Sequence, residues 1–427
     1  MYIYTVKAGD TLQSISRTYE VSPQEVITIN DLENPDVLAV GQALILPTDT
    51  HSYVVSVGET LGQIANRLGQ SLAELYADNP ALRTRPLMAG ETIFVRTPPT
   101  KRASLEVNGY AYTFIEAGVL EKALPYLTYL TIFSYGARAD GGLVPVEDEA
   151  LIAAAKSAGV APIMLLSTIG EDGTFNSEVA RVVLEDANVQ QTLIENLVTV
   201  LDQKGYYGID VDFEFIPTNL GQAYADFITN LRQAIAPKKV FVALAPKTSA
   251  LQRGLLYEAH DYALLGAAAD RALLMTYEWG YTYGPPMAVA PLDQVRRVLE
   301  YAVSAIPPEK ILLGLPNYAY DWPLPFVRGE TAATSLGNPQ AAALAGTEGA
   351  EIFFDSKAAS PTFTYFKEGV AHEVWFEDAR SVRDKLRLTE EFKLKGVGVW
   401  NIMRPFGQLW YLLDYYYNIV KLSLYST

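Results

Sequence analysis

Short apolar runs alternate with helical stretches along most of the chain after residue 102. Eight of these runs have the length and composition of buried strands, and segments with helical periodicity separate them. The expected strands are Glu106–Phe114, Leu127–Tyr135, Ala161–Thr168, Gly208–Phe215, Val240–Pro246, Ala272–Glu278, Ile311–Pro316 and Gly396–Asn401. Eight strand–helix units predict an α/β fold, a (β/α)8 TIM barrel with its active site at the C-terminal ends of the strands.

The barrel region is longer than eight such units require, and the extra length lies at about 317–378. Aromatic, strand-like runs occur in this segment at 352–354, 362–366 and 373–376. We therefore expect a small inserted β-rich subdomain that walls one side of the cleft.

The first hundred residues repeat with a period of 49. Tyr4-Thr5-Val6 matches Tyr53-Val54-Val55, and Gly41-Gln42 matches Gly90-Glu91 in the same register. A register kept without gaps over this length indicates two copies of one small domain. Each copy is predicted to run strand, helix, helix, strand, with a threonine capping the first helix.

The repeat and the strand pattern together predict three domains. The two small βααβ domains are expected at 1–48 and 51–97, and the barrel at 102–427. Paired prolines within Thr97 to Lys101 favour an extended backbone, so this stretch is expected to be a stiff linker.

Three carboxylates, Asp210, Asp212 and Glu214, alternate with apolar residues in the fourth predicted strand. Period-two alternation places the three acids on one face. A solvated strand face would explain the pattern by itself, but helices predicted at 189–204 and 220–236 flank the strand. Parallel strands covered by helices have no freely solvated face, so the acids must point into a barrel or cleft. Burying three acids together is costly, which is typical of a site where carboxylates do chemistry.

Further polar and aromatic residues lie where other predicted strands end. Aromatic faces stack on sugar rings while polar groups fix the hydroxyls, so these residues together predict a sugar pocket. They are Tyr277, Glu278 and Trp279 at the sixth strand, Tyr318, Asp321 and Trp322 after the seventh, and Trp400 at the eighth.

The composition excludes several classes of function. The formal net charge is −16, with 49 acidic and 33 basic residues, which argues against binding of nucleic acid or an acidic membrane. The chain has no cysteine, so disulfides and thiolate chemistry are excluded. His51, His260 and His372 lie far apart without metal-ligand spacing, and we expect no metal and no cofactor.

Targeting signals and membrane spans are also not expected. Residues 1–10 lack the basic region and apolar run of a signal peptide, which predicts synthesis without export. No stretch reaches about 18 consecutive apolar residues, the length that a membrane-spanning helix needs.

Both N-terminal repeats resemble the LysM domain, through the Y-x-V-x-x-G-[DE]-T-L opening, the mid-domain Asn and the closing strand. LysM domains bind N-acetylglucosamine-containing glycans, so the resemblance implies peptidoglycan or a related glycan as partner. The implied contact residues are Gly9, Asp10, Thr11 and Asn30 in the first repeat and Gly58, Glu59, Thr60 and Asn79 in the second. The turn and the helix cap alone would also require these glycines and threonines, and both interpretations stay open.

The barrel residues resemble glycoside hydrolase family 18. The family pattern D-G-x-D-x-D-x-E is matched by Tyr207 to Glu214, M-x-Y-D by Met275 to Glu278, and the Trp of the last strand by Trp400. Two positions depart from the pattern: Tyr207 replaces the first Asp, and Glu278 replaces the Asp of the sixth strand. Glu278 is one methylene longer than Asp, which would reshape the sugar pocket.

The resemblance implies retaining, substrate-assisted hydrolysis, in which the acetamido group of the substrate replaces an enzyme nucleophile. Glu214 would transfer the protons, Asp212 would hold the acetamido N–H, Tyr277 would orient the acetamido carbonyl, and Asp210 would support them. Residues two apart on a strand have Cα atoms about 6.6–6.8 Å apart. We therefore expect Asp210 and Asp212 to raise the proton affinity of Glu214.

Within the family, the domain order and the runs at 245–249 and 372–378 are similar to the cortical fragment-lytic N-acetylglucosaminidases of spore-forming bacteria. This implies cleavage of N-acetylglucosaminyl bonds in spore-cortex peptidoglycan and a place in the spore envelope. A chitinase and a catalytically weak glycan-binding protein remain alternatives. These patterns do not predict whether the enzyme cleaves within a chain or at its end, and they do not predict its oligomeric state.

Overall fold

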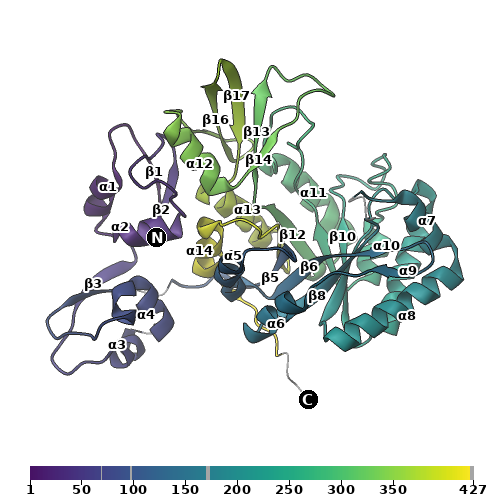
Figure 1. The fold of residues 1–427 in the computed structure, drawn as a ribbon, viewed down its shortest axis with the longest axis horizontal. Coiled ribbons are helices and arrows are strands. Elements are labelled where there is room, and N and C mark those ends of the chain that lie inside the picture. Colours follow the sequence, from purple (N-terminus) through teal and green to yellow (C-terminus); the bar gives the residue numbers. More distant parts are fainter. Residues whose placement is uncertain (69, 97–98, 170–173, 424–427) are drawn as a thin grey trace.

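The computed structural model of the chain describes residues 1–68, 70–96, 99–169 and 174–423. Residues 97 and 98 of the expected linker lie outside this range. The described residues form a strand barrel, a β-rich insertion beside its mouth and two small N-terminal domains (Figure 1).

Strand pairing closes the barrel. Among the described residues, eight parallel strands pair in the order β5-β18-β12-β11-β10-β9-β8-β6, and β6 pairs with β5 to complete the ring. They are β5 (Ala103–Tyr112), β6 (Tyr129–Ala137), β8 (Ala161–Ser167), β9 (Gly208–Asp212), β10 (Lys239–Leu244), β11 (Arg271–Leu274), β12 (Ile311–Pro316) and β18 (Gly396–Trp400). Each overlaps one predicted strand, so the TIM-barrel prediction is confirmed. The short strands β7 (Leu143–Val144) and β19 (Tyr417–Ile419) extend the sheet beside β6 and β5.

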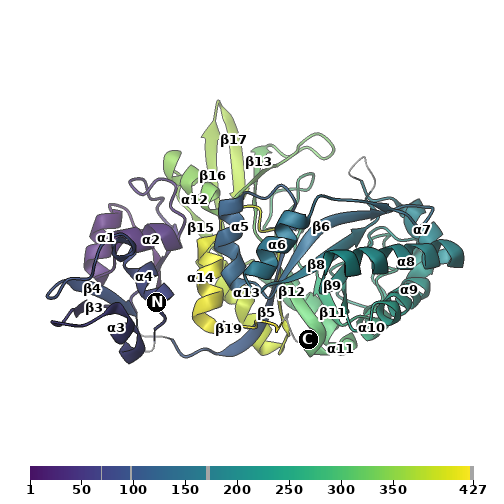
Figure 2. The same ribbon diagram turned by 60° about the horizontal axis from the view of Figure 1, so that its bottom comes forward.

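Helices cover the outside of the ring (Figures 1 and 2). They are α5 (Ala117–Ala123), α6 (Glu149–Ser157), α7 (Ser177–Glu185), α8 (Ala187–Lys204), α9 (Gly221–Ala234), α10 (Tyr262–Ala268), α11 (Leu292–Ala305), α13 (Ala379–Glu391) and α14 (Gly407–Tyr416). Helix α8 leads into β9. Asp186 caps its N-terminus, where its side chain accepts hydrogen bonds from the Asn188 and Val189 N–H groups. It ends at Gly205, whose φ of +67° is the left-handed conformation that glycine adopts freely.

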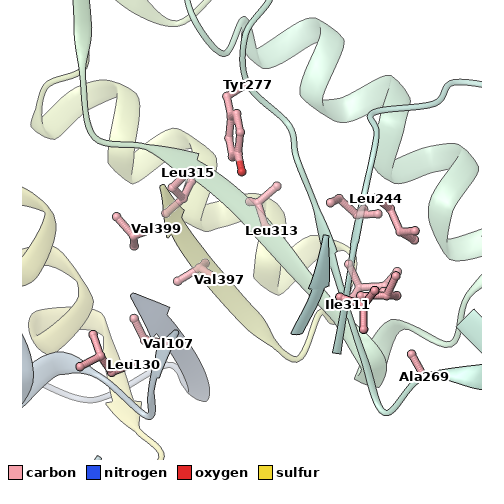
Figure 3. Close-up of a cluster of buried hydrophobic side chains, with 14 of the residues drawn as sticks. Val107, Leu130, Leu244, Ala269, Tyr277, Ile311, Leu313, Leu315, Val397 and Val399 are labelled. Carbon is pink, nitrogen blue, oxygen red and sulfur yellow. The ribbon is translucent and has the colours of Figure 1, made fainter. Parts of the chain in front are cut away.

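Alternation along the strands divides the apolar residues of the barrel into two layers. Leu313 and Leu315 of β12 and Val397 and Val399 of β18 point outward and pack under the helices (Figure 3). A second cluster fills the inside of the ring: Tyr110, Tyr129, Ala161, Ile163, Leu165, Phe241, Ala243, Leu273 and Leu312. Because this interior is packed, a ligand can enter only beyond the strand ends.

The insertion lies between β12 and α13, within the expected segment. In the part of the chain that is described, it forms a five-stranded antiparallel sheet in the order β14-β13-β17-β16-β15. The elements are β13 (Ala319–Leu324), β14 (Thr334–Leu336), α12 (Asn338–Thr347), β15 (Phe353–Asp355), β16 (Ser360–Lys367) and β17 (Val370–Trp375). In both views the sheet projects from one end of the barrel (Figures 1 and 2).

The two N-terminal repeats fold as predicted, each as strand, helix, helix, strand. The first comprises β1 (Tyr2–Thr5), α1 (Leu12–Tyr19), α2 (Pro23–Ile29) and β2 (Ala43–Leu46), and the second β3 (Thr50–Val54), α3 (Leu61–Leu68), α4 (Leu72–Asp78) and β4 (Thr92–Arg96). Their strands pair antiparallel within each repeat. Each repeat has its own apolar core.

The first repeat packs against the barrel and the insertion. The amide of Gln408 on α14 donates to the Asn30 Oδ1 and to the Ala43 carbonyl, each at 2.9 Å. The Ile352 N–H donates to the Val40 carbonyl at 2.8 Å. Among the described helices, none is long and apolar enough to cross a membrane.

Candidate active site

The three predicted acids lie at the C-terminal end of β9. Strand β9 ends at Asp212, earlier than predicted, and the chain turns after Glu214 because Phe215 takes a φ of +53°. Asp210 and Asp212 are buried, and Asp210 Oδ2 accepts from the Tyr110 hydroxyl at 2.6 Å. Ile209, Val211 and Phe213, which alternate with the acids, belong to the outer apolar layer. The alternation therefore turns the acids inward, as their spacing predicts.

A cavity of about 690 Å³ opens beyond the strand ends, and five predicted site residues line it together with Asp212. These five are Glu214, Tyr277, Glu278, Trp279 and Trp400. Trp400 lies against an aromatic wall, with ring centroids 5.8 Å from Tyr110, 6.1 Å from Tyr112 and 5.2 Å from Phe133. A cavity of this size with an aromatic wall and clustered carboxylates suits a sugar unit.

Burial changes the protonation of all three acids. It raises the pKa of Asp210 to about 6, against the hydrogen bond from Tyr110 that lowers it. Burial, and then the charges of Glu214 and Asp210, raise the pKa of Asp212 well above its ordinary value. Burial, and then the charge of Glu278, raise the pKa of Glu214 to about 7.

Glu278 joins the residues that were expected to act on Glu214. Burial has the largest effect on Glu214, and the charge of Glu278 raises its pKa further. The charge of Glu214 in turn raises the pKa of Asp212, because two neighbouring buried carboxylates repel each other. Glu214 is thus partly protonated near neutral pH, which a general acid needs.

Tyr277 is held by the neighbouring strand. Its ring packs beside Leu313 and Leu315 (Figure 3). A Cβ at Gly314 would come within 2.8 Å of the Tyr277 Cε1, so only glycine leaves room for this ring position. Burial and the charges of Asp212, Glu214 and Glu278 keep the pKa of Tyr277 well above its ordinary value, so the hydroxyl remains a hydrogen-bond donor.

Glu278, where the family pattern has Asp, is fixed by Tyr318, which lies between β12 and β13, and by Tyr320 of β13. It adopts a φ of +65°, and its carboxylate accepts from the Tyr318 hydroxyl and, at 3.2 Å, from the Tyr320 hydroxyl. Burial raises the pKa of Glu278 above its ordinary value, while both hydroxyls lower it. Tyr318, predicted to bind substrate, lies outside the cavity lining and instead positions Glu278.

The structure does not bring Asp321 and Trp322 to the cavity, which corrects their predicted placement. Asp321 of β13 accepts from the Tyr365 hydroxyl of β16 at 2.6 Å and pairs with His372 of the neighbouring strand β17 at 2.8 Å. Trp322 is fully buried and donates through Nε1 to the Gly284 carbonyl at 2.8 Å. Both side chains thus stabilise the insertion and its contact with the loop after β11.

The other departure from the family pattern, Tyr207, lies before β9 and away from the cavity lining. Its ring centroid is 6.0 Å from that of Tyr129 within the barrel. Its replacement of Asp therefore changes packing at the entry to the strand rather than the cavity wall.

Several cavity residues were not singled out from the sequence. Tyr112 ends the first barrel strand, so the rule applied to the other strand ends would have found it, whereas Phe133 lies in the middle of β6. The loop after β10 contributes Thr248, Ser249, Gln252 and Tyr257, and helix α11 contributes Gln294 and Arg297. These last residues have no strand-end signature.

His260 joins two strand ends beneath the cavity. Its Nδ1 accepts from the Ala245 N–H at 2.8 Å, and its Nε2 lies 2.9 Å from the Phe213 carbonyl. Burial lowers the pKa of His260 to about 4, so the ring is neutral and its Nε2–H donates to Phe213. No group of three or more metal-ligating side chains occurs among the described residues.

The predicted glycan contacts of the two repeats have internal hydrogen-bonding roles in the structure. Asp10 and Glu59 each accept from a tyrosine hydroxyl of their own repeat, and Gly9 and Gly58 have φ values of +86° and +82°. Thr11 and Thr60 accept the N3 N–H of helices α1 and α3. Asn30 accepts from the Ile45 N–H at 2.7 Å, and Asn79 accepts in the same way from the Phe94 N–H at 2.8 Å. These bonds hold the turns on which the resemblance places the glycan.

The model of the glycosyl hydrolases family 18 matches residues 149–404, more than half of the chain. The chain belongs to this family. LysM domain models match residues 4–47 and 53–96, which identifies the two repeats. This family 18 protein is therefore a glycoside hydrolase with two N-terminal LysM domains, as the sequence patterns predict.

Two of the similar proteins align with nearly the whole chain, and a third aligns with about three quarters of it. The cortical fragment-lytic enzyme of Bacillus subtilis (strain 168) is 37% identical over 429 residues, covering 99% of each chain. The crystal structure of the spore cortex-lytic enzyme SleL from Bacillus megaterium QM B1551 aligns with a TM-score of 0.83 at 37% identity, over 98% of this chain and 99% of that one. A chitinase from Chromobacterium violaceum aligns with a TM-score of 0.67 at 25% identity, over 73% of this chain and 98% of that one.

Proposed function

We propose that this family 18 enzyme hydrolyses N-acetylglucosaminyl bonds in peptidoglycan fragments of the spore cortex. The observation that carries the proposal is the cavity in which Asp212, Glu214 and Tyr277 converge beside Trp400. Similarity over nearly the full length to an enzyme described as cortical fragment-lytic supports peptidoglycan as substrate and the spore envelope as location. The proposed LysM domains at 1–48 and 51–97 would hold the glycan, and the barrel at 102–427 would cleave it.

Glu214 is the proposed acid and base. With a pKa near 7, part of the enzyme population carries the proton that the glycosidic oxygen needs. After the leaving sugar departs, the Glu214 carboxylate takes a proton from the incoming water, and hydrolysis proceeds with retention of configuration.

Asp212 and Tyr277 are the proposed partners of the substrate acetamido group. Asp212 lines the cavity and its Oδ1 is buried without a hydrogen-bond partner, so this oxygen can accept the acetamido N–H. The Tyr277 hydroxyl would donate to the acetamido carbonyl and aim it at the anomeric carbon. Asp210, held by Tyr110, supports Asp212 from within the barrel.

Glu214→Gln tests the acid. The variant keeps the size of the side chain but cannot transfer the proton, so we expect kcat on peptidoglycan fragments to fall about 100-fold or more. Release of reducing ends measures turnover, and co-sedimentation with the fragments measures binding, which should persist. Wild-type turnover in this variant would show that another group is the acid.

The second candidate function is a chitinase, which the alignment with the Chromobacterium violaceum chitinase over the barrel favours. Both substrates present N-acetylglucosamine on the non-leaving side, so the same acids serve both. Digestion of spore-cortex fragments and of colloidal chitin, compared at equal enzyme concentration, separates them. A glycan-binding protein without turnover would release reducing ends from neither.

A further inference from the structure

The catalytic cavity has two chemically different walls. Strands β5, β6 and β18 supply the aromatic wall of Tyr112, Phe133 and Trp400. The loop after β10 and helix α11 supply a polar wall: Thr248, Ser249, Gln252, Tyr257, Gln294 and Arg297. Because β10 and β11 lie across the ring from β5 and β18, the two walls face each other over the acids.

Arg297 is the one Lys, Arg or His side chain among the described residues that line the cavity. Its Nη1 donates to the Gln294 Oε1 at 3.3 Å, and it has no ion pair with any residue that the structure describes. Its neighbour Arg296 points elsewhere, to the Glu391 carboxylate at 2.8 Å. Arg297 thus presents an unpaired guanidinium to a cavity that also contains three carboxylates.

The position of the acids assigns the polar wall to one side of the scissile bond. In the proposed mechanism Glu214 lies beside the glycosidic oxygen, and Trp400 lines the same cavity as Asp212 and Tyr277, the proposed partners of the acetamido group. The next sugar, which leaves, then lies on the other side of Glu214, against the polar wall. Chitin is uncharged there, whereas the alternate sugar of peptidoglycan carries an acidic substituent.

We propose that Arg297 binds a carboxylate carried by the leaving sugar and so selects acidic peptidoglycan units over uncharged chitin. The inference rests on the proposed function and names a specificity residue for it. A planar guanidinium can donate two parallel hydrogen bonds to a carboxylate, which fixes the orientation of the carboxylate as well as offsetting its charge. In a chain with net charge −16, a cation at the cavity reduces the repulsion of an acidic substrate.

Two sources can supply this carboxylate. In peptide-free glycan the carboxylate belongs to the lactyl ether group of the muramic acid residue. In peptide-bearing glycan that group is an amide, and the carboxylates belong to the stem peptide. Arginine binds either carboxylate in the same way. The test therefore uses one substrate with the stem peptide and one without it to distinguish the two sources.

Arg297→Ala, Arg297→Lys and a matched control, Arg296→Ala, test the proposal. Kinetics are measured on peptide-bearing fragments, on peptide-free strands and on N-acetylchitotetraose. We expect Arg297→Ala to lower the ratio of kcat/KM for an acidic substrate over chitotetraose about tenfold, mainly through KM. Arg297→Lys should restore part of the ratio, and Arg296→Ala should keep the wild-type ratio.

The acidic substrate on which the ratio falls identifies the source of the carboxylate. An unchanged ratio on both acidic substrates, or an equal loss on all three substrates, would overturn the role of Arg297. The wild-type arm tests the proposed function separately: cleavage of chitotetraose without cleavage of either peptidoglycan substrate would overturn that function, and the inference with it.

Discussion

At the scale of single residues, the site is set by which carboxyl holds a proton. Burial, and then the charges of Glu214 and Asp210, raise the pKa of Asp212 well above its ordinary value. Glu214 is less enclosed and titrates near 7, with Glu278 as the charged neighbour that raises it. Burial therefore supplies the larger part of the tuning of the acid, and Glu278, in the loop after β11 where the family pattern has Asp, supplies a further part.

The pH profile of kcat/KM should report this tuning. Activity requires protonated Glu214, so kcat/KM of the wild type should fall as the pH rises above about 7. Glu278→Gln removes a like charge but keeps an oxygen that can accept from Tyr318, so the pKa of Glu214 should decrease. The alkaline limb should then move to lower pH.

A matched variant, Glu330→Gln, removes a carboxylate from an exposed residue outside the cavity lining. Its profile should coincide with that of the wild type. A Glu278→Gln profile with an unmoved alkaline limb would show that Glu278 does not set the pKa of the acid.

At the scale of elements, close strand contact fixes Tyr277. A methyl group at Gly314 of β12 would come within 2.3 Å of the Leu274 carbonyl and 2.8 Å of the Tyr277 ring. We expect Gly314→Ala to lower the free energy of unfolding by about 1–3 kcal/mol, because the packed strands must separate. The displaced Tyr277 should also lower kcat, since the acetamido carbonyl loses its donor.

Gly118 in helix α5 provides the control, because a Cβ there meets no atom within 4 Å. Gly118→Ala should raise the stability slightly through helix propensity and leave kcat unchanged. Thermal unfolding and initial rates measure both effects. Wild-type stability and kcat in Gly314→Ala would contradict the proposed constraint on Tyr277.

The elements were largely predictable from the sequence, and their long-range partners were not. A buried strand such as Ile311–Pro316 can be recognised from the residues of its own segment. The same holds for the alternation of acidic and apolar residues at Asp210 and Asp212. Asp321 has the same kind of local signal, but its partners Tyr365 and His372 lie 44 and 51 residues away. Only their pairing in the insertion shows that it turns away from the cavity.

Arg297 shows the opposite limit of prediction from sequence. It lies on an amphipathic helix directly beside a second arginine, so the sequence does not distinguish it from Arg296. In the folded protein Arg297 of α11 lines the cavity, whereas Arg296 donates to the Glu391 carboxylate.

At the scale of the whole molecule, a buried charge cluster joins the two LysM domains to the barrel. Arg96 of β4 pairs with Glu25 of α2 at 2.8 Å and with Asp78 of α4, and its guanidinium lies 5.7 Å from the Tyr411 ring of α14. Asp49 is the further carboxylate that acts on Glu25. Acids thus outnumber the arginine at the point where three parts of the chain meet.

This excess should make the junction depend on pH. Burial, and then Asp78 and Asp49, raise the pKa of Glu25 to about 8, against the opposing effect of Arg96. The folded state therefore binds the proton more tightly than the unfolded chain, and this stabilisation is complete at low pH and lost as the pH rises through about 8.

The melting temperature of the wild type should fall between pH 6 and 9, by roughly 2–4 °C for each kcal/mol lost. Glu25→Gln, which is neutral throughout, should flatten this fall, whereas Glu121→Gln on the exposed face of α5 should retain it. Parallel melting curves for Glu25→Gln and the wild type across this pH range would show that Glu25 is not the group responsible.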